Sequence, residues 1–366
     1  MLTKEIAREI VEQTMIRLNR NINIMDHEGK IIASGNPDRI GLLHEGALEV
    51  LRTGIPLLVT RHHLDHWEGT LPGMNLPIQF QNQIIGVIGI TGEPEEIQEF
   101  GELVKMVTEM MINQSFIASQ LEWKQRMKEQ IFEDLLLEQA PQESIRQRLN
   151  LLNLQWIPPF QVGLVEGTHS TLKKQELIEK MAQNLDEKRV MIGSIGANRL
   201  FFLFSGIPEA LIYRKMDHLQ KFLHQMGIDH RIGLGTSKID QGNIRYSLDE
   251  AKAALTYGTP SQTLISYTEI ETKALLSSVD AYAKERFLER ILNQMPDKML
   301  DTLDVFFRCN LNIGASAKVL YIHRNTLNYR ISKMKEVTGY DPLQFQDAVS
   351  LQLALWLHQI KQRHRE

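Results

Sequence analysis

The feature that most limits the possible folds is a helical pattern that runs from Pro94 to Pro141 without an internal breaker. At 1.5 Å per residue, these roughly 45 residues would form a rod of about 70 Å. Apolar residues recur at alternating spacings of three and four, which is the heptad spacing of a coiled coil. These residues are Leu103, Val107, Met110, Ile117 and Leu121. Polar Gln114 occupies the position between Met110 and Ile117 in this series. The pattern fits helices folded back on the preceding module and a dimerising coiled coil equally well. It predicts a long helical connector over residues 94–140.

In the segment before this connector, the pattern of apolar and polar residues predicts short strands and few helices. A helix spans Ile6 to Met15, a hairpin turns at 27–29, and a second helix covers about 43–52. A strand at 55–60 and a hairpin around 81–83 complete about five antiparallel strands. Residues 1–93 are therefore expected to form an α+β sensor core of the PAS/GAF-like kind.

The remainder divides into an α/β module and a helical module. Residues 155–270 read in the order βαββαβα, which predicts a sheet of about four strands. Helical periodicity dominates residues 296–366. The expected fold class is thus a multidomain α+β chain that ends in an all-α domain.

The composition limits the cell compartment and the binding partners that are expected for this protein. Cys309 is the only cysteine, so neither an intrachain disulfide nor a cysteine-based zinc site can form. The longest apolar run, Ile84 to Ile90, is far short of the ~20 residues that span a bilayer. Charged residues interrupt the N-terminus, which is unlike a signal peptide, and we expect a cytoplasmic protein without a membrane contact. The formal net charge of −4 means that any nucleic-acid binding must come from a local basic patch.

Such a patch lies near the C-terminus. The window from Lys318 to Lys335 holds five Lys or Arg residues and no acid. Asn312 is a suitable N-cap for a short helix that ends at Leu320, and residues 321–323 form a tight turn. A second helix runs from Arg324 to about Val337 and stops at Gly339, and a last helix begins at 341–342. Two short helices joined in this way, with small Ala317 at their crossing, form a helix-turn-helix.

The second of these helices presents a polar face. Leu327, Ile331 and Met334 form one buried stripe at 100° per residue. Five side chains point away from it: Asn325, Asn328, Tyr329, Ser332 and Lys333. Arg324 and Arg330 flank the stripe, where they can contact phosphates, while amides and Lys can read base edges. The alternative is an ordinary solvated basic helix.

The run AKVLYIHRNTLNYRISKMKEVTGYDP resembles the helix-turn-helix that ends the purine-catabolism and sugar-diacid regulators. The residues that match that pattern are Arg324, Thr326, Leu327, Arg330 and Ile331. The resemblance adds Thr326 to the candidate DNA-binding residues.

In the N-terminal module, small residues surround a few polar ones. Glycines let backbone N–H groups approach a ligand, and Arg39 offers a bidentate fork to a carboxylate. The pattern favours a small polyhydroxylated acid, although the glycines can also serve turns and Arg39 can be a surface charge. The candidate ligand-binding set is Ser34, Gly35, Arg39, Gly41, His44, Glu45, Gly46, Asn75, Pro77, Thr91 and Gly92.

The segments IASGNPDRIGLLHEGA, MNLPIQF and IIGVIGITGEPEEI are similar to the sugar-diacid recognition domain of the carbohydrate diacid regulators. The likeness covers residues 1 to about 130. It implies a sensor for an aldarate, glycerate or a similar small sugar acid, and an activator of genes for their breakdown. Operator DNA is then the partner, and no cofactor is expected. A single helix-turn-helix buries too little DNA for high specificity alone, so we expect a homodimer on paired half-sites. RNA polymerase is a further expected partner.

A histidine-rich run in the N-terminal module has the spacing of a metal motif. The run Arg61-His62-His63-Leu64-Asp65-His66 approaches a zinc-hydrolase motif, but Arg61 cannot coordinate a metal. We therefore expect a solvated loop and no metal site.

The middle module resembles diguanylate cyclase domains through HRIGLGTS and LDEAKAALTYG. Those domains hold metal and nucleotide with acids at the turn of their central hairpin, whereas the turn over Ile195 to Leu200 has no carboxylate. We expect a catalytically inactive spacer and no enzyme activity. An enzyme of cyclic-dinucleotide chemistry and a helical scaffold without DNA binding remain as alternatives.

Overall fold

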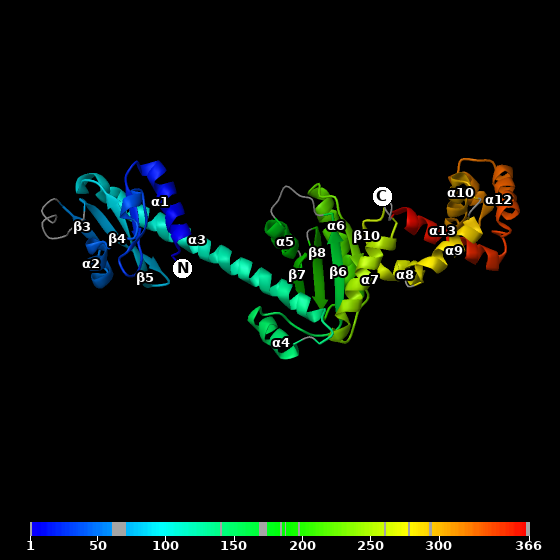
Figure 1. Cartoon of the computed structure of the whole chain (residues 1–366), viewed down its shortest axis with the longest axis horizontal. Helices are drawn as coiled ribbons and strands as arrows, with labels where there is room; N and C mark the ends of the chain where they lie inside the picture. The colour runs from blue at the N-terminus through cyan, green and yellow to red at the C-terminus, as the bar shows by residue number, and fades with distance from the viewer. Residues whose placement is uncertain are drawn as a thin grey trace. The chain divides into compact units, whose positions relative to one another are not determined.

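The computed structural model describes residues 2–60, 71–139, 141–167, 174–183, 185–186, 188–196, 198–259, 261–276, 279–292 and 295–363. The chain divides into two compact units, Met1–Arg126 and Met127–Glu366. Figure 1 shows the elements and their labels. The loop at 61–66 lies outside the described residues, so the metal motif there is not tested.

The first unit is built on a five-stranded antiparallel sheet with the strand order β2-β1-β5-β4-β3. Gln81 and Asn82 both have positive φ, as the hairpin turn requires. The elements are α1 (Lys4–Leu18), β1 (Ile22–Met25), β2 (Ile31–Ser34), η1 (Pro37–Arg39), α2 (Glu45–Thr53), β3 (Leu57–Val59), β4 (Gly73–Phe80) and β5 (Gln83–Thr91).

The two faces of this sheet carry different helices. On one face, Ile10 of α1 and Val104 of α3 (Pro94–Leu135) pack against Ile22 and Ile88. On the other face, Ala47 and Val50 of α2 pack against the alternate residues of the same strands. Helix α2 therefore covers the face that α1 and α3 leave open.

Helix α3 has one buried face within the first unit. Its residues Ile97, Val104 and Ile112 are buried in the core against the sheet, which agrees with the folded-back alternative. The residues at heptad spacing lie on a different side and are exposed. The predicted helix is wrong at its end, because α3 stops at Leu135 and Pro141 begins a separate helix, α4 (Gln142–Leu151).

The middle of the chain forms a second five-stranded sheet in the order β10-β9-β6-β8-β7. The expected count of four strands missed β10, a three-residue strand that pairs parallel to β9 at the edge. The elements are β6 (Phe160–Glu166), α5 (Lys174–Ala182), β7 (Val190–Ile195), β8 (Arg199–Ser205), α6 (Glu209–Gln225), β9 (Arg231–Leu234), η3 (Gln241–Asn243), α7 (Ile244–Tyr257) and β10 (Leu264–Ser266).

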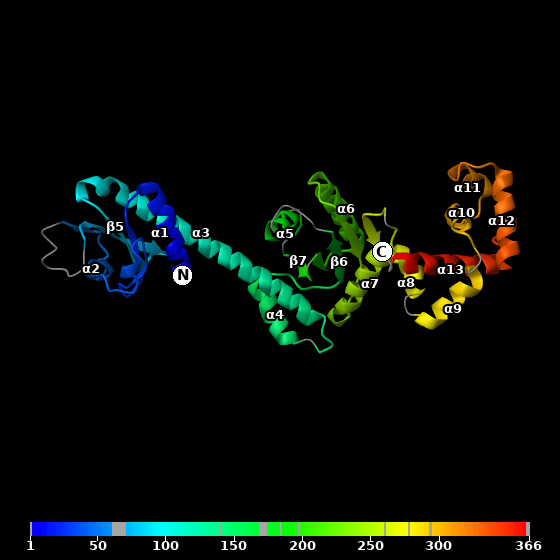
Figure 2. The same ribbon diagram turned by 45° about the horizontal axis from the view of Figure 1, so that its top comes forward.

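This second sheet is the centre of a three-layer sandwich. Helices α5 and α6 cover one face, where Met181 and Met216 join the core around Phe202. The C-terminal end of α3, together with α4 and α7, covers the other face (Figure 2). Phe132 of α3 stacks on Phe201 of β8 with ring centroids 3.7 Å apart. Alternate residues of β8 thus pack into opposite layers, as a buried strand requires.

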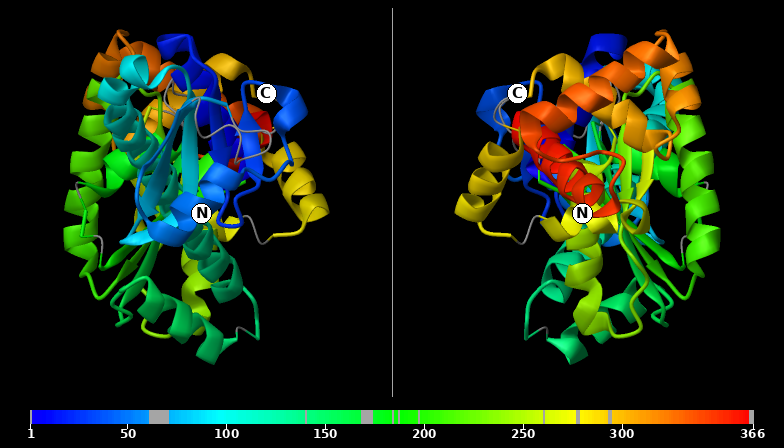
Figure 3. Two further views of the ribbon diagram at one scale, coloured as in Figure 1. Left: turned by 90° about the vertical axis from the view of Figure 1, so that its left-hand side faces the viewer. Right: turned by 90° about the vertical axis from the view of Figure 1, so that its right-hand side faces the viewer.

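The rest of the chain is helical. Its elements are α8 (Tyr267–Leu275), α9 (Ala281–Leu292), α10 (Asp297–Arg308), α11 (Ile313–Val319), α12 (Arg324–Thr338) and α13 (Phe345–Arg363). Helix α13 begins at Phe345 and not at 341–342, because Asp341 and Pro342 form a turn. Leu303, Met334 and Leu351 bring α10, α12 and α13 into one core, and Figure 3 shows α12 in orange and α13 in red. None of the described helices is long and apolar enough to span a bilayer.

Candidate functional site

The helix-turn-helix is formed by α11 and α12, and its local structure follows from its caps. The Asn312 side chain accepts a hydrogen bond from the Ala315 amide at 2.9 Å and begins α11. The His323 ring accepts from the Asn325 amide at 3.3 Å and begins α12. Gly339, with a φ of 77°, ends α12 in the left-handed conformation that glycine tolerates.

A small residue lets the two helices cross closely. Ala317 is 5% exposed and packs with Leu327, Ile331 and Phe306 of the supporting helix α10. A larger side chain at this crossing would overpack it. We therefore predict that Ala317→Leu lowers the free energy of unfolding by about 1–3 kcal/mol, measured by denaturant unfolding of the full chain, whereas the exposed Val319→Leu change leaves it within about 0.5 kcal/mol. Equal effects of the two changes would contradict the packing.

The polar face predicted for α12 faces solvent. Tyr329 is 68% exposed, and five other candidate residues are exposed as well: Arg324, Asn325, Thr326, Asn328 and Ser332. The first turn of α12 has no acidic residue. The partial positive charge of the helix N-terminus and the charge of the Arg324 guanidinium therefore both contribute to a positive potential there. This face has the size and chemistry that fit a DNA major groove.

Two of the predicted DNA contacts have partners within the protein. Arg330 is half-buried, and its Nη1 donates to the Thr302 hydroxyl of α10 at 2.9 Å. Lys333 pairs with Glu336 at 2.9 Å, just outside the acid-free window. Arg330 therefore also positions α12 on α10, and its replacement by alanine is not expected to leave the fold unchanged.

In the sensor unit, cross-strand register places polar side chains in one row. Ser34 pairs with Asn23, Asn23 with Gly89, and Gly89 with Asn75, across four neighbouring strands. Directly paired residues point to the same face, here the α2 face. The Ser34 hydroxyl donates to Asn23 Oδ1 at 2.6 Å. A Cβ at Gly89 would lie 2.9 Å from Asn75 Oδ1, so glycine at this position lets the Asn75 side chain lie close to the middle of the polar row.

The start of α2 adds an imidazole to the polar row. His44 is the N-cap of α2, and its Nδ1 accepts the Ala47 amide at 3.2 Å. A Cβ at Gly46 would lie 2.9 Å from Asn75 Nδ2 and 3.3 Å from the His44 ring. Gly46 therefore allows His44 and Asn75 to approach each other. Burial, and next the positive charge of Arg39, lower the pKa of His44 to about 4.

Arg39, the last residue of η1, acts on His44 through its charge, and the other ten candidate ligand residues separate into two groups. Ser34, His44, Gly46 and Asn75 lie together at the polar row, and Thr91 follows Gly89 by two residues on the same face. Of the other candidates, Pro77 lies on the same face beside Val87. Gly35 lies against Met15 of α1, Gly92 lies against Ile97 of α3, Gly41 makes the turn after η1, and Glu45 is exposed in the first turn of α2.

The sequence reasoning missed three members of this site: Asn21, Asn23 and Gly89. Asn23 is 2% exposed within the apolar strand INIM. Asn21 Nδ2 donates to Thr91 Oγ1 at 3.5 Å. A buried asparagine in an apolar strand was the signal that could have identified the row.

The pKa of His44 leads to a stability prediction. Its folded pKa of about 4 lies below its unfolded value, so only the unfolded state takes up a proton as the pH falls from 7.5 to 5. The sensor should lose about 2 kcal/mol of stability over that range from this group. His44→Asn keeps an N-cap acceptor and should remove most of this loss. Thermal unfolding of the wild type and of His44→Asn at a series of pH values measures how much stability each protein loses. If both proteins lose the same amount of stability between pH 7.5 and 5, the prediction is contradicted.

An acidic residue ends β6, the strand beside the β7–β8 hairpin of the middle module. Glu166, at the end of β6, is held by Arg199 of β8 in an ion pair of 2.6 Å. The charge of this carboxylate is therefore already paired within the protein. No cluster of three potential metal-ligating side chains occurs in the described part of the chain.

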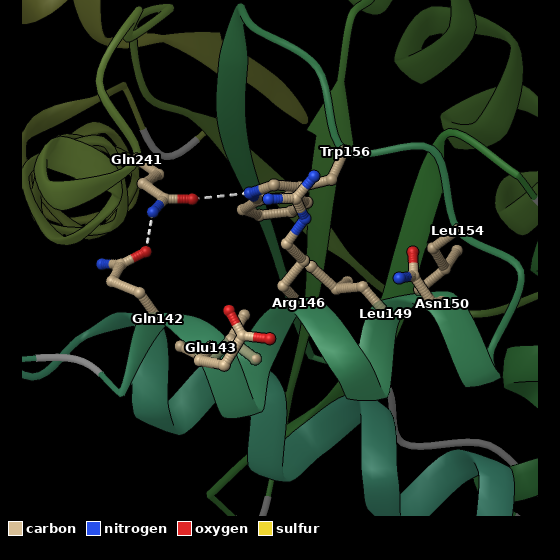
Figure 4. Close-up of a pocket in the computed structure, with 9 residues that line it drawn as sticks. Gln142, Glu143, Arg146, Leu149, Asn150, Leu154, Trp156 and Gln241 are labelled. Carbon is tan, nitrogen blue, oxygen red and sulfur yellow. Dashed lines mark hydrogen bonds between the residues drawn. The ribbon is translucent and has the colours of Figure 1, made fainter.

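A pocket of about 460 Å³ lies between α4 and η3 in this module (Figure 4). Trp156 Nε1 donates to Gln241 Oε1 at 2.6 Å, and the Gln241 amide donates to Gln142. These two hydrogen bonds link α4 to η3 and to Trp156.

Three family models match consecutive parts of the chain. The sugar diacid recognition model matches residues 2–135, the GGDEF-like domain model matches 138–257, and the PucR C-terminal helix-turn-helix domain model matches 299–357. These matches follow one another in the order of a sensor, a GGDEF-like module and a helix-turn-helix.

Relatives match along nearly the whole chain. The carbohydrate diacid regulator of Escherichia coli K12 is 31% identical, over 97% of this chain and 98% of its own. The protein YsfB of Bacillus subtilis 168 is 26% identical over 96% of both chains. A Haemophilus influenzae protein is 27% identical over 97% of this chain and 99% of its own.

The helix-turn-helix, the sensor module and these matches define a ligand-responsive transcription regulator and not an enzyme. The chain belongs to the carbohydrate diacid regulator family. The likeness of the middle module to GGDEF domains is one of fold.

Proposed function

We propose that this regulator binds a sugar diacid, or a related small hydroxy acid, at the polar row and binds operator DNA as a homodimer through α11 and α12. Residues 1–93 act as the PAS/GAF-like sensor, 94–140 as the connector, 155–270 as an inactive spacer, and 296–366 as the DNA-binding domain. It works in the cytoplasm as an activator that contacts RNA polymerase. Its E. coli relative carries the name carbohydrate diacid regulator, which supports the effector class.

The observation that carries the effector proposal is the polar row beside Arg39. Amide and hydroxyl groups of Asn23, Ser34 and Asn75 offer both donors and acceptors, which a polyhydroxylated chain needs. Arg39 is close enough to lower the pKa of His44, and its guanidinium can bind a carboxylate with two parallel hydrogen bonds. The neutral imidazole of His44 adds no charge of its own at neutral pH.

The dimer proposal rests on the size of the DNA-binding element. One helix-turn-helix reads a single half-site, and regulators of this type bind two half-sites through a two-fold symmetric pair. Paired recognition helices therefore require two copies of the chain.

Arg39→Ala is expected to weaken acid binding at least tenfold, because a charge-assisted bidentate contact is lost. The effector is first identified by thermal shift with six-carbon aldarates, glycerate and glycolate, since ligand at 100 times its Kd adds about 2.7 kcal/mol. Calorimetry then compares the variant with the wild type. Arg52→Ala, which removes an exposed Arg paired with Glu49 on α2, should bind normally. Unchanged affinity in Arg39→Ala would place the site elsewhere.

A further inference from the structure

One side of α3 is apolar and uncovered. The residues Leu103, Val107, Met110, Ile117 and Leu121 are 51%, 39%, 61%, 52% and 42% exposed. They follow one another at spacings of four and three residues, with exposed Gln114 in the same series. We call these six residues the α3 seam. At 1.5 Å per residue the seam is about 27 Å long.

The α3 seam points away from the face that packs on the sensor sheet. At 100° per residue, the buried residues Val104, Thr108 and Ile112 lie on average about 140° around the helix from the seam. The sensor core therefore packs against one side of α3, and the seam on another side has no packing partner among the described residues. Packing of the sensor alone does not require apolar residues there.

The distribution of charge around the α3 seam favours a helix of the same kind as its partner. In the heptad repeat, Val107, Gln114 and Leu121 are a positions, and Leu103, Met110 and Ile117 are d positions. With this assignment, no residue at an a, d, e or g position between 103 and 121 is charged. The charged residues of this stretch occupy outer positions: Lys105 and Glu109. A 3.5-residue repeat fits a partner helix with the same repeat, and α3 of a second copy meets this condition.

A groove between α1 and α3 continues the α3 seam. It has a volume of about 550 Å³. Its α3 wall and Leu18 are apolar, and the α1 wall also carries Glu9, Gln13, Thr14 and Arg17. In a parallel coiled coil, a g residue faces the e residue of the next heptad in the other helix. Met106 is a g residue, 51% exposed, and in a parallel pair it would meet the partner's Met111 at the edge of this groove.

We propose that the α3 seams of two copies pack together as a parallel two-stranded coiled coil, with Met106 of each copy in the α1–α3 groove of the other. This inference rests on the proposed homodimer and assigns its interface. A parallel pair keeps the two DNA-binding halves at the same end of the coil, as two half-sites need. Gln114 faces its counterpart at an a position, where a polar residue fixes the register at a cost in stability.

Disulfide trapping tests the pairing and its direction. In full-length Cys309→Ser protein, Leu103→Cys should give a disulfide-linked dimer on mild oxidation, because parallel d positions face each other. Lys105→Cys, on the outer side of the same helix, should remain a monomer on a non-reducing gel. Equal linkage of both would refute the seam. The Leu103→Cys protein is also mixed with a Leu121→Cys protein. If Leu103→Cys forms a disulfide only with Leu121→Cys and not with itself, the helices are antiparallel and the parallel arrangement is overturned.

Sedimentation of charge variants gives a second test that does not depend on cysteine chemistry. Met110→Lys combined with Ile117→Lys should weaken dimerisation at least 100-fold, because like charges would meet across the coil. Ser119→Lys, outside the seam, should dimerise as the wild type does, and Gln114→Leu should dimerise more tightly. Unchanged dimerisation in the double variant would overturn the proposal. A wild type that binds acid and DNA but sediments as a monomer would refute the seam and leave the effector proposal standing.

Discussion

Arg324→Glu is expected to weaken operator binding by about 10²- to 10⁴-fold. Arg324 is exposed at the first position of α12, where no acid opposes it. A hydrogen bond to a charged group contributes about 1.5–3 kcal/mol, and a dimer loses two of them. The reversed charge also repels the phosphates. The measurement is fluorescence anisotropy with an operator duplex selected from random sequence.

The matched control for this change is Lys335→Ala. Lys335 lies at the other end of α12 and pairs with Asp341 at 2.9 Å, so its loss should change operator affinity by less than threefold. Asn325→Ala and Tyr329→Ala should instead alter sequence preference, since base contacts determine specificity. If Arg324→Glu binds the operator as tightly as Lys335→Ala does, α12 is not docked in the major groove as proposed.

Operator affinity is expected to fall by about 10³- to 10⁵-fold between 50 and 200 mM salt, if the dimer contacts about 6 to 10 phosphates. The chain has a net charge of −4, so this dependence must come from the basic helix-turn-helix and not from the whole surface. Arg324→Ala should reduce the slope of log affinity against log salt by about 2, one for each copy. An affinity that does not change with salt would contradict binding through phosphates.

The helix-turn-helix was predictable from sequence because its determinants are local. Asn312 and Gly339 act within one turn of the helices that they cap, and Ala317 stands where the apolar stripe of α12 crosses α11. The contact of Arg330 with Thr302 was not predictable, since the two residues are 28 positions apart in the sequence and lie on different helices. A half-buried arginine and an exposed one look alike in the sequence.

The sensor site was predicted only in part, because it depends on strand register. His44 and Gly46 stood out as a turn before a helix, and the structure brings both to Asn75. Asn23 joins them through the pairing of β1 with β5, whose nearest ends are 58 positions apart in the sequence. Register between strands so distant in sequence is set by the packed core and not by any local pattern.

The connector shows a different limit of sequence reasoning. Its heptad spacing was visible, but spacing does not say which side of a helix a neighbouring module covers. The structure buries Val104 and Ile112 against the sensor and leaves Leu103 and Met110 in solvent. The edge strand β10 was missed for another reason, since three residues are too few to show alternation.

The central claim is that acid binding in the sensor changes DNA binding by the helix-turn-helix. Coupling of 1–3 kcal/mol would change operator affinity about 5- to 150-fold, and reciprocity requires the operator to change acid affinity by the same factor. The direct measurement is calorimetric titration of the acid into the free protein and into the protein–operator complex. We predict dissociation constants that differ at least fivefold. Equal dissociation constants would contradict the claim that the sensor controls DNA affinity.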